Sequence, residues 1–182
     1  MTSFLGKGSS NLVKRVLDHV GLPSDATSHT NYLSEFLDIY TSEPAKFTTV
    51  FDQVHEVLRD LRSSGIALGL CTNKPESATD VVLEEFGLTA FFDSIVGGDR
   101  LLSRKPDPAM LYLVMEELAV ERCLFVGDSE VDVATAKAAG VPIALFTRGY
   151  RQTSVAELAP DFNFDDFRNL TAIATSFLAA TS

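Results

Sequence analysis

Cysteine, histidine and positive charge are all scarce in this sequence of 182 residues. The two cysteines, Cys71 and Cys123, lie in apolar runs, and their spacing matches no metal-binding motif. We therefore expect buried thiols in a reducing compartment. The three histidines, His19, His29 and His55, do not pair with a serine or cysteine in a catalytic pattern, and we interpret them as surface or packing residues.

The shortage of positive charge argues against two classes of partner. The chain carries 15 basic and 25 acidic residues, which gives a formal net charge of −10. Neither nucleic acid nor an anionic membrane attracts so acidic a protein. A small phosphorylated metabolite is still compatible with this charge, because it needs only a few local donors. Since there is also no signal peptide and no apolar run near 18 residues, we expect a cytoplasmic protein.

Apolar residues are plentiful, and their pattern predicts the fold class. Hydrophobic residues make up 46% of the chain, which is enough for one domain with a sizeable core. Apolar residues recur with a helical period up to about residue 63, and after Gly65 short apolar runs alternate with helical segments. Strands are expected at 66–71, 94–98, 123–128 and 142–147, and helices at about 11–20, 31–40, 48–63, 75–87, 107–118, 130–139 and 166–179. This alternation predicts an α/β fold with a parallel sheet that is covered on both faces.

Three stretches carry polar side chains near the ends of expected strands. In two of them these side chains lie at the end of a strand or directly after it, and the third lies in a loop that leads into a helix. The stretches are LGLCTNKP (68–75), RKPDP (104–108) and VGDSEVD (126–132). In open α/β sheets, ligands bind beyond the carboxyl ends of the strands. We therefore expect these three stretches to meet at one point.

The side chains in these stretches suit phosphoryl transfer. The hydroxyl of Thr72 and the amide of Asn73 are donors for phosphate oxygens, and the ammonium of Lys105 balances phosphate charge. The carboxylate of Asp128 is an oxygen ligand suited to Mg²⁺, and Asp132 follows on the first turn of the next helix. Catalysis of phosphoryl transfer consists mostly of positioning and charge neutralisation.

Each of these residues also has a purely structural interpretation. Thr72 and Asn73 could form an ordinary turn before a helix, and Lys105 could be a solvated loop residue. Asp128 could be a turn acid, and Asp132 could complement the helix dipole. The order of the three stretches along the chain favours the functional interpretation, because chance rarely produces all of them together.

The three stretches resemble motifs II, III and IV of the haloacid dehalogenase-like hydrolases, and most closely those of the phosphoglycolate phosphatase branch. The resemblance extends from about residue 5 to about residue 170 and includes GGDRLLSRKPDP, FVGDSEVDVATAKAAG and TRGY (147–150). SFLGKG (3–8) is similar to a segment of the helical cap in such phosphatases, which implies that Gly6 and Lys7 contact the substrate.

The resemblance implies a Rossmann-like (HAD-like) core, a helical cap and Mg²⁺-dependent hydrolysis of a small phosphomonoester through an aspartyl-phosphate. The substrate that it favours is 2-phosphoglycolate. By the same resemblance, Thr72 binds the phosphoryl group with Asn73 beside it, and Lys105 neutralises the nucleophile and the phosphoryl group. Asp128 coordinates the metal, and Asp132 supports the metal site from behind that carboxylate or through water.

One motif of the family has no counterpart in this sequence. Motif I reads D-x-D-x-T and supplies the nucleophile and the general acid, and this chain contains no D-x-D. We therefore expect a partial cap at 1–47 and a core at 48–182 that lacks its first strand. In the family that strand lies between the strands that carry Thr72 and Asp128. Its absence is expected to leave unpaired backbone groups and an apolar gap.

Three explanations for this departure remain open. The natural protein could be longer, another segment or a second chain could fill the gap in a non-catalytic phosphate- or partner-binding protein, or the chain could be a decayed fragment. Within the family, a pyrophosphatase or a sugar-phosphate phosphatase is the alternative to a phosphoglycolate phosphatase. In each case we expect marginal stability or self-association, because the gap would expose apolar surface.

Overall fold

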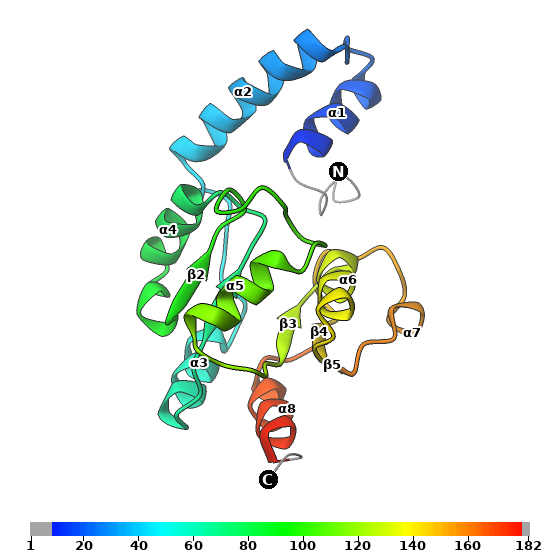
Figure 1. The fold of residues 1–182 in the computed structure, drawn as a ribbon. Helices are drawn as coiled ribbons and strands as arrows, with labels where there is room; N and C mark the ends of the chain where they lie inside the picture. The colour runs from blue at the N-terminus through cyan, green and yellow to red at the C-terminus, as the bar shows by residue number, and fades with distance from the viewer. Residues whose placement is uncertain (1–8, 180–182) are drawn as a thin grey trace.

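The computed structural model describes residues 9–179, which form a helical hairpin and an α/β core (Figure 1). The hairpin consists of α1 (Ser9–Val20) and α2 (Ala26–Ser42), which pack against each other and project from one end of the core. The carboxylate of Asp25 begins α2, because it accepts hydrogen bonds from the backbone N–H groups of Thr27 and Ser28. Gly6 and Lys7 lie outside the described residues, so their expected contact with substrate stays a prediction.

The core alternates strands and helices, as the sequence predicts. Its elements are α3 (Val54–Ser63), β1 (Gly69–Cys71), α4 (Glu76–Glu85), the 3₁₀ turn η2 (Thr89–Phe91), β2 (Ser94–Val96), α5 (Ala109–Glu117), β3 (Phe125–Gly127), α6 (Glu130–Ala139), β4 (Ile143–Phe146), α7 (Val155–Leu158), β5 (Phe162–Phe164) and α8 (Arg168–Ala179). No helix in this part of the chain is long and apolar enough to cross a membrane.

All strand pairs are parallel, but the strands form two separate sheets. One sheet contains β1 and β2, and the other has the order β3-β4-β5. Helix α5 packs on β1 and β2, α6 packs on β3 and β4, and α5 and α6 contact each other. Helices α3 and α8 pack together, and α8 also contacts β5. The expected α/β class and parallel pairing are therefore confirmed, with helices on both faces.

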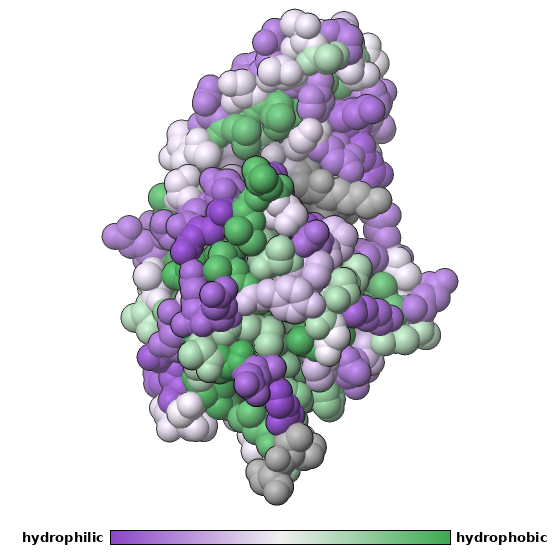
Figure 2. All heavy atoms as spheres, in the orientation of Figure 1, coloured by the Kyte–Doolittle hydropathy of each residue, from purple (hydrophilic) through white to green (hydrophobic). Residues whose placement is uncertain are grey.

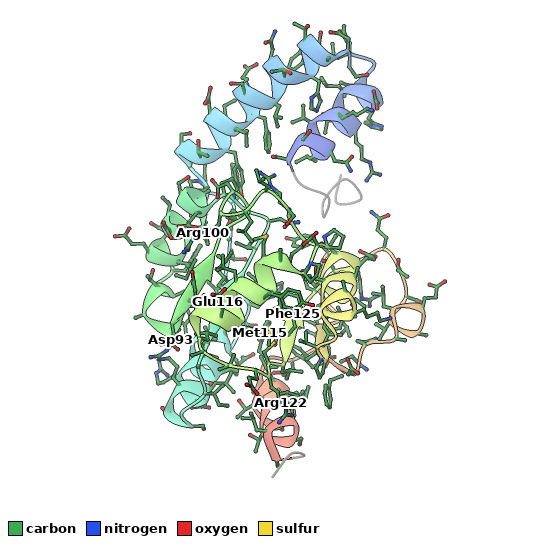
Figure 3. The ribbon with its side chains drawn as sticks, viewed as in Figure 1. Asp93, Arg100, Met115, Glu116, Arg122 and Phe125 are labelled. Atoms are coloured by element: carbon green, nitrogen blue, oxygen red, sulfur yellow. The ribbon has the colours of Figure 1, made fainter. Side chains whose placement is uncertain are left out.

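Between β1 and β3 lies an apolar slot with a volume of about 710 Å³. It is lined by both strands and by side chains of α3, α5 and α8. Figure 3 shows Phe125 of β3 and Met115 of α5 side by side at the middle of the core, and Figure 2 shows hydrophobic side chains gathered over this region. Val126 is 38% exposed although it lies in the middle of β3. The slot corresponds to the gap that the sequence predicts.

The hydrogen-bond pattern of each sheet shows which backbone N–H groups of β1 and β3 point into the slot. Neighbouring residues of a strand direct their N–H groups to opposite sides. Thr72 N donates to Val96 O of the β2 side, so the N–H of Cys71 points away from β2 and into the slot. Phe125 N donates to Pro142 O beside β4, so the N–H of Val126 also points into the slot. In the part of the chain that the structure describes, each sheet therefore has one edge with unpaired backbone groups facing the slot.

Several boundaries differ from the expected ones for identifiable reasons. The strand expected at 66–71 begins only at Gly69, and the carboxylate of Asp93 accepts the N–H of Leu68 in place of a strand partner. The helix expected from 48 begins at Val54, because Phe51 packs instead on the rings of Phe146 and Phe167. Residues 162–164, where the sequence analysis expected no strand, form the short strand β5.

We predict that backbone amides facing the slot exchange faster with solvent than those facing a paired strand. Hydrogen exchange measured by NMR should show the amides of Cys71 and Val126 exchanging at least tenfold faster than those of Leu70 and Gly127, because the latter are bonded within the sheets. Equal protection of Val126 and Gly127 would contradict an open slot and would indicate that a second copy covers it.

Candidate functional site

The three stretches that the sequence singles out do meet at the carboxyl ends of the strands. The side chain of Asn73, which follows β1, binds the backbone of Lys105 twice: Nδ2 donates to Lys105 O at 3.0 Å, and Oδ1 accepts from Lys105 N at 2.9 Å. The ammonium of Lys105 then donates to Asp132 Oδ1 on α6 at 2.7 Å. A continuous chain of hydrogen bonds therefore links the turn after β1, the loop at 104–108 and the first turn of α6.

Asp132 is fixed by the way in which α6 begins. Ser129 is the N-cap residue, and Asp132 occupies the third helical position of a capping box. Its Oδ2 accepts hydrogen bonds from the N–H groups of Asp128 and Ser129 at 3.1 Å and from the Ser129 hydroxyl at 2.6 Å. Gly127 makes this approach possible, because a Cβ atom there would lie 2.2 Å from the Cβ of Asp132.

The ion pair between Lys105 and Asp132 is almost completely buried. Their side chains are 11% and 8% exposed, and the ammonium also lies 5.5 Å from the centre of the Phe125 ring. Burial acts to raise the pKa of Asp132, but the charge of Lys105 and the hydrogen bonds from Lys105 and Ser129 outweigh it and lower that pKa. Both oxygens of Asp132 are thus occupied, and this arrangement favours a supporting role over direct metal coordination.

Asp128 lies at the end of β3, next to this ion pair. Its Oδ2 accepts a hydrogen bond from the backbone N–H of Tyr150 at 3.2 Å. Burial raises the pKa of Asp128, and the neighbouring Asp132 carboxylate raises it further. Gly149 is required here, because a Cβ atom at that position would lie 2.2 Å from the Cβ of Asp128. A partly buried carboxylate whose charge is disfavoured is one that a cation would stabilise.

The loop after β4 is held rigidly against Asp128. Arg151 donates to the carbonyl groups of Thr147 and Thr153 at 3.1 Å, and the carboxylate of Glu130 accepts the N–H of Thr153 at 2.5 Å. This bracing positions the N–H of Tyr150. The sequence analysis included the TRGY segment in the family pattern but gave no role to Arg151 or Glu130. The Arg151 contacts depend on the exact course of the loop, and Glu130 lies 23 positions before Thr153 in the chain.

Thr72 is placed to donate a hydrogen bond beyond the end of β1. Its backbone N–H continues the ladder to Val96 O at 3.1 Å, and its hydroxyl oxygen accepts the N–H of Lys74 at 3.2 Å. The hydroxyl proton therefore remains available for a ligand oxygen. Cys71, which precedes it, is no candidate nucleophile, because burial raises the pKa of its thiol to about 11.

Residues 9–179 contain no group of three or more His, Cys, Asp or Glu side chains that could hold a metal ion. Asp128 offers one carboxylate, and Asp132 lies behind it. Mg²⁺ usually takes one or two protein carboxylates and completes its coordination with phosphate and water. The residues present therefore fit a Mg²⁺ ion that shares its coordination with a phosphorylated ligand.

A hydroxyl, an ammonium and a carboxylate at the ends of parallel strands define a site of the phosphoryl-transfer class. The family model described as haloacid dehalogenase-like hydrolase matches residues 6–146. The chain belongs to this family of hydrolases.

Similar proteins agree with this assignment. A phosphoglycolate phosphatase of Cereibacter sphaeroides (strain ATCC 17029 / ATH 2.4.9) is 46% identical over 158 residues, which are 87% of this chain and 72% of that protein. A phosphoglycolate phosphatase of Rhodospirillum rubrum is 42% identical over 172 residues, which span 91% of this chain and 71% of that protein. The crystal structure of a predicted phosphoglycolate phosphatase from Haemophilus somnus superposes with a TM-score of 0.85 at 27% identity, over 94% of this chain and 80% of that one. Together these relatives support a phosphoric monoester hydrolase.

We predict that replacing Lys105 with Met lowers the free energy of unfolding by about 3–5 kcal/mol at pH 7, because the Asp132 charge would remain buried without a partner. Urea unfolding measures this change. The matched control is Arg148→Met, which breaks an exposed pair with Asp165 and should cost less than about 1 kcal/mol.

The same variant has a predicted pH dependence. Because the folded pKa of Asp132 is lowered, its stabilising contribution is fully present above the unfolded pKa of about 4 and is lost as the pH falls through the folded value. The stability difference between the wild type and Lys105→Met should therefore shrink below about pH 4. A difference that is the same at pH 3 and pH 7 would contradict the ion-pair explanation.

Proposed function

We propose that this chain forms most of a Mg²⁺-dependent phosphatase that hydrolyses 2-phosphoglycolate through an aspartyl-phosphate. The observation that carries the proposal is the hydrogen-bonded connection from Asn73 through Lys105 to Asp132, which places the Thr72 turn and Asp128 at one edge of the sheet. The named activity of the similar proteins from Cereibacter sphaeroides and Rhodospirillum rubrum supports this substrate. The two free cysteines agree with a reducing compartment such as the cytoplasm.

The proposed roles follow from the groups that remain available. The Thr72 hydroxyl binds a phosphoryl oxygen, and the Lys105 ammonium neutralises phosphoryl charge while Asp132 holds it in place. Asn73 acts by fixing the Lys105 backbone, and its amide also lies beside the phosphoryl group. Asp128 would hold Mg²⁺. Asp132 would support the metal site from behind Asp128, whose backbone N–H it already accepts. When bound, the metal would screen the negative charge of the phosphate.

The attacking carboxylate is the one component that the described residues do not place at the site. The slot between β1 and β3 has the parallel borders, apolar lining and unpaired backbone groups that an added strand would require. A strand in that slot that runs parallel to both neighbours would end between Thr72 and Asp128. We therefore propose that an aspartate at its carboxyl end is the nucleophile. We also propose that residues 1–47 belong to the cap and 48–182 to the core.

A non-catalytic phosphate- or partner-binding protein is the second candidate. It is favoured by the absence of any D-x-D in this sequence. Such a protein would bind phosphate esters at Thr72 and Lys105 without turnover. A pyrophosphatase or a sugar-phosphate phosphatase is the alternative within the family, and substrate comparison in the same assay separates them.

The test supplies the proposed strand as a synthetic peptide. We expect the chain alone to release no phosphate from 2-phosphoglycolate in the presence of Mg²⁺, because it contributes no nucleophile. Adding a peptide of about ten residues, apolar and ending in Phe-Asp-Met-Asp-Gly-Thr, should produce release that is measurable with a colorimetric phosphate assay.

Two controls make this experiment decisive. A peptide with Asn in place of its first Asp should give no release, and Asp128→Asn in the chain should lower the release with the active peptide by about 100-fold or more. Phosphate release by the chain alone would contradict the missing nucleophile. A peptide that binds without producing release would favour the non-catalytic candidate.

A further inference from the structure

Lys74 is anchored in the same turn as the proposed phosphoryl-binding hydroxyl. Its backbone N–H donates to Thr72 Oγ1 at 3.2 Å, and its carbonyl oxygen accepts the N–H of Gly98 at 2.7 Å. Gly98 lets the turn pack closely, since a Cβ atom there would lie 2.3 Å from Asn73 O. Because they are only two positions apart along the chain, the Cα atoms of Thr72 and Lys74 are at most about 7 Å apart. Lys74 has no role in the reaction described so far.

The ammonium of Lys74 lies where the helical hairpin meets the core. It donates a hydrogen bond to the hydroxyl of Tyr40 on α2, and it lies 4.8 Å from the centre of the Tyr40 ring. The Tyr40 ring is itself stacked on Phe36, with ring centres 5.7 Å apart. The hairpin therefore holds this cation in a defined position by an aromatic face and one acceptor.

Among the described residues, this partly buried cation has no carboxylate partner. Within residues 9–179 Lys74 forms no ion pair, whereas Lys105, which is also partly buried, is paired with Asp132. The guanidinium of Arg151 is likewise partly buried but is used by two loop carbonyl groups. An ammonium has three donors, and Tyr40 accepts only one of them. With respect to residues 9–179, Lys74 thus retains donors and an unbalanced positive charge beside the proposed phosphoryl-binding turn.

We propose that Lys74 binds a carboxylate of the substrate, with Tyr40 as the residue that positions its ammonium. This inference rests on the proposed phosphatase function and identifies how the site would select a phosphorylated carboxylic acid. In 2-phosphoglycolate the carboxylate is separated from the phosphate by a single methylene group. An anion that close to the phosphoryl group falls within reach of a lysine two residues beyond Thr72.

Equilibrium binding tests this inference without requiring turnover. Calorimetry in the presence of Mg²⁺ compares 2-phosphoglycolate with ethyl phosphate, which has a similar size but no carboxylate, and with inorganic phosphate. In Lys74→Met we expect the Kd for 2-phosphoglycolate to rise about tenfold or more, because a charge-assisted contact is lost. The Kd values for ethyl phosphate and inorganic phosphate should change by less than about twofold.

Two further variants separate recognition from structure. Tyr40→Phe keeps the aromatic face and removes the acceptor, and it should weaken 2-phosphoglycolate binding about threefold while leaving ethyl phosphate unaffected. Lys46→Met is the control, because Lys46 is exposed and pairs with Glu43 on the surface. It should change no Kd.

The outcomes distinguish this inference from the proposed function. If ethyl phosphate and inorganic phosphate bind the wild type but Lys74→Met weakens all ligands equally or none, carboxylate recognition by Lys74 is wrong and the phosphoryl site stands. If none of the three ligands binds the wild type, both proposals are wrong.

Discussion

The buried ion pair between Lys105 and Asp132 is the interaction on which the site depends. Two charges removed from water are stable only when their remaining hydrogen-bonding groups are satisfied. Ser129 and the N-terminus of α6 satisfy Asp132, and Asn73 fixes the backbone that carries Lys105. The same contacts join both sheets at their carboxyl ends. The pair is thus a structural bridge across the slot, and it holds an ammonium at the proposed phosphoryl site.

The slot explains how the fold and the chemistry are related. Two parallel sheets with facing unpaired edges are an unusual arrangement, because open edges invite pairing with another chain. The helices around the slot already supply apolar surfaces on both faces, so an added strand would complete the core and bring a carboxylate to the site. Under the proposed function, stability and catalysis have the same requirement, because the strand that fills the slot would also carry the nucleophile.

The sequence predicted the α/β class, the parallel pairing and the meeting of three loops, because strand ends and their polar residues are local patterns. It also predicted that Asp132 lies on the first turn of the next helix, but it did not predict the capping box that Asp132 forms with Ser129. It did not predict that Asn73 would hold the Lys105 backbone, that Arg151 would brace the loop at Tyr150, or that Lys74 would meet Tyr40. The contacts of Asn73 and Lys74 join residues more than 30 positions apart, and the Arg151 contacts depend on the exact course of one loop. Strand β5 was missed because its three residues carry no clear period.

The most direct test of the account is a crystal structure of the chain soaked with tungstate, an oxyanion that mimics phosphate, and Mg²⁺. The account predicts tungstate bound to the Thr72 hydroxyl and the Lys105 ammonium, with Mg²⁺ at Asp128 and the Lys105–Asp132 pair unchanged. Tungstate bound elsewhere, or absent from this point in a crystal in which no neighbouring molecule blocks it, would contradict the claim that the three loops form one phosphoryl site.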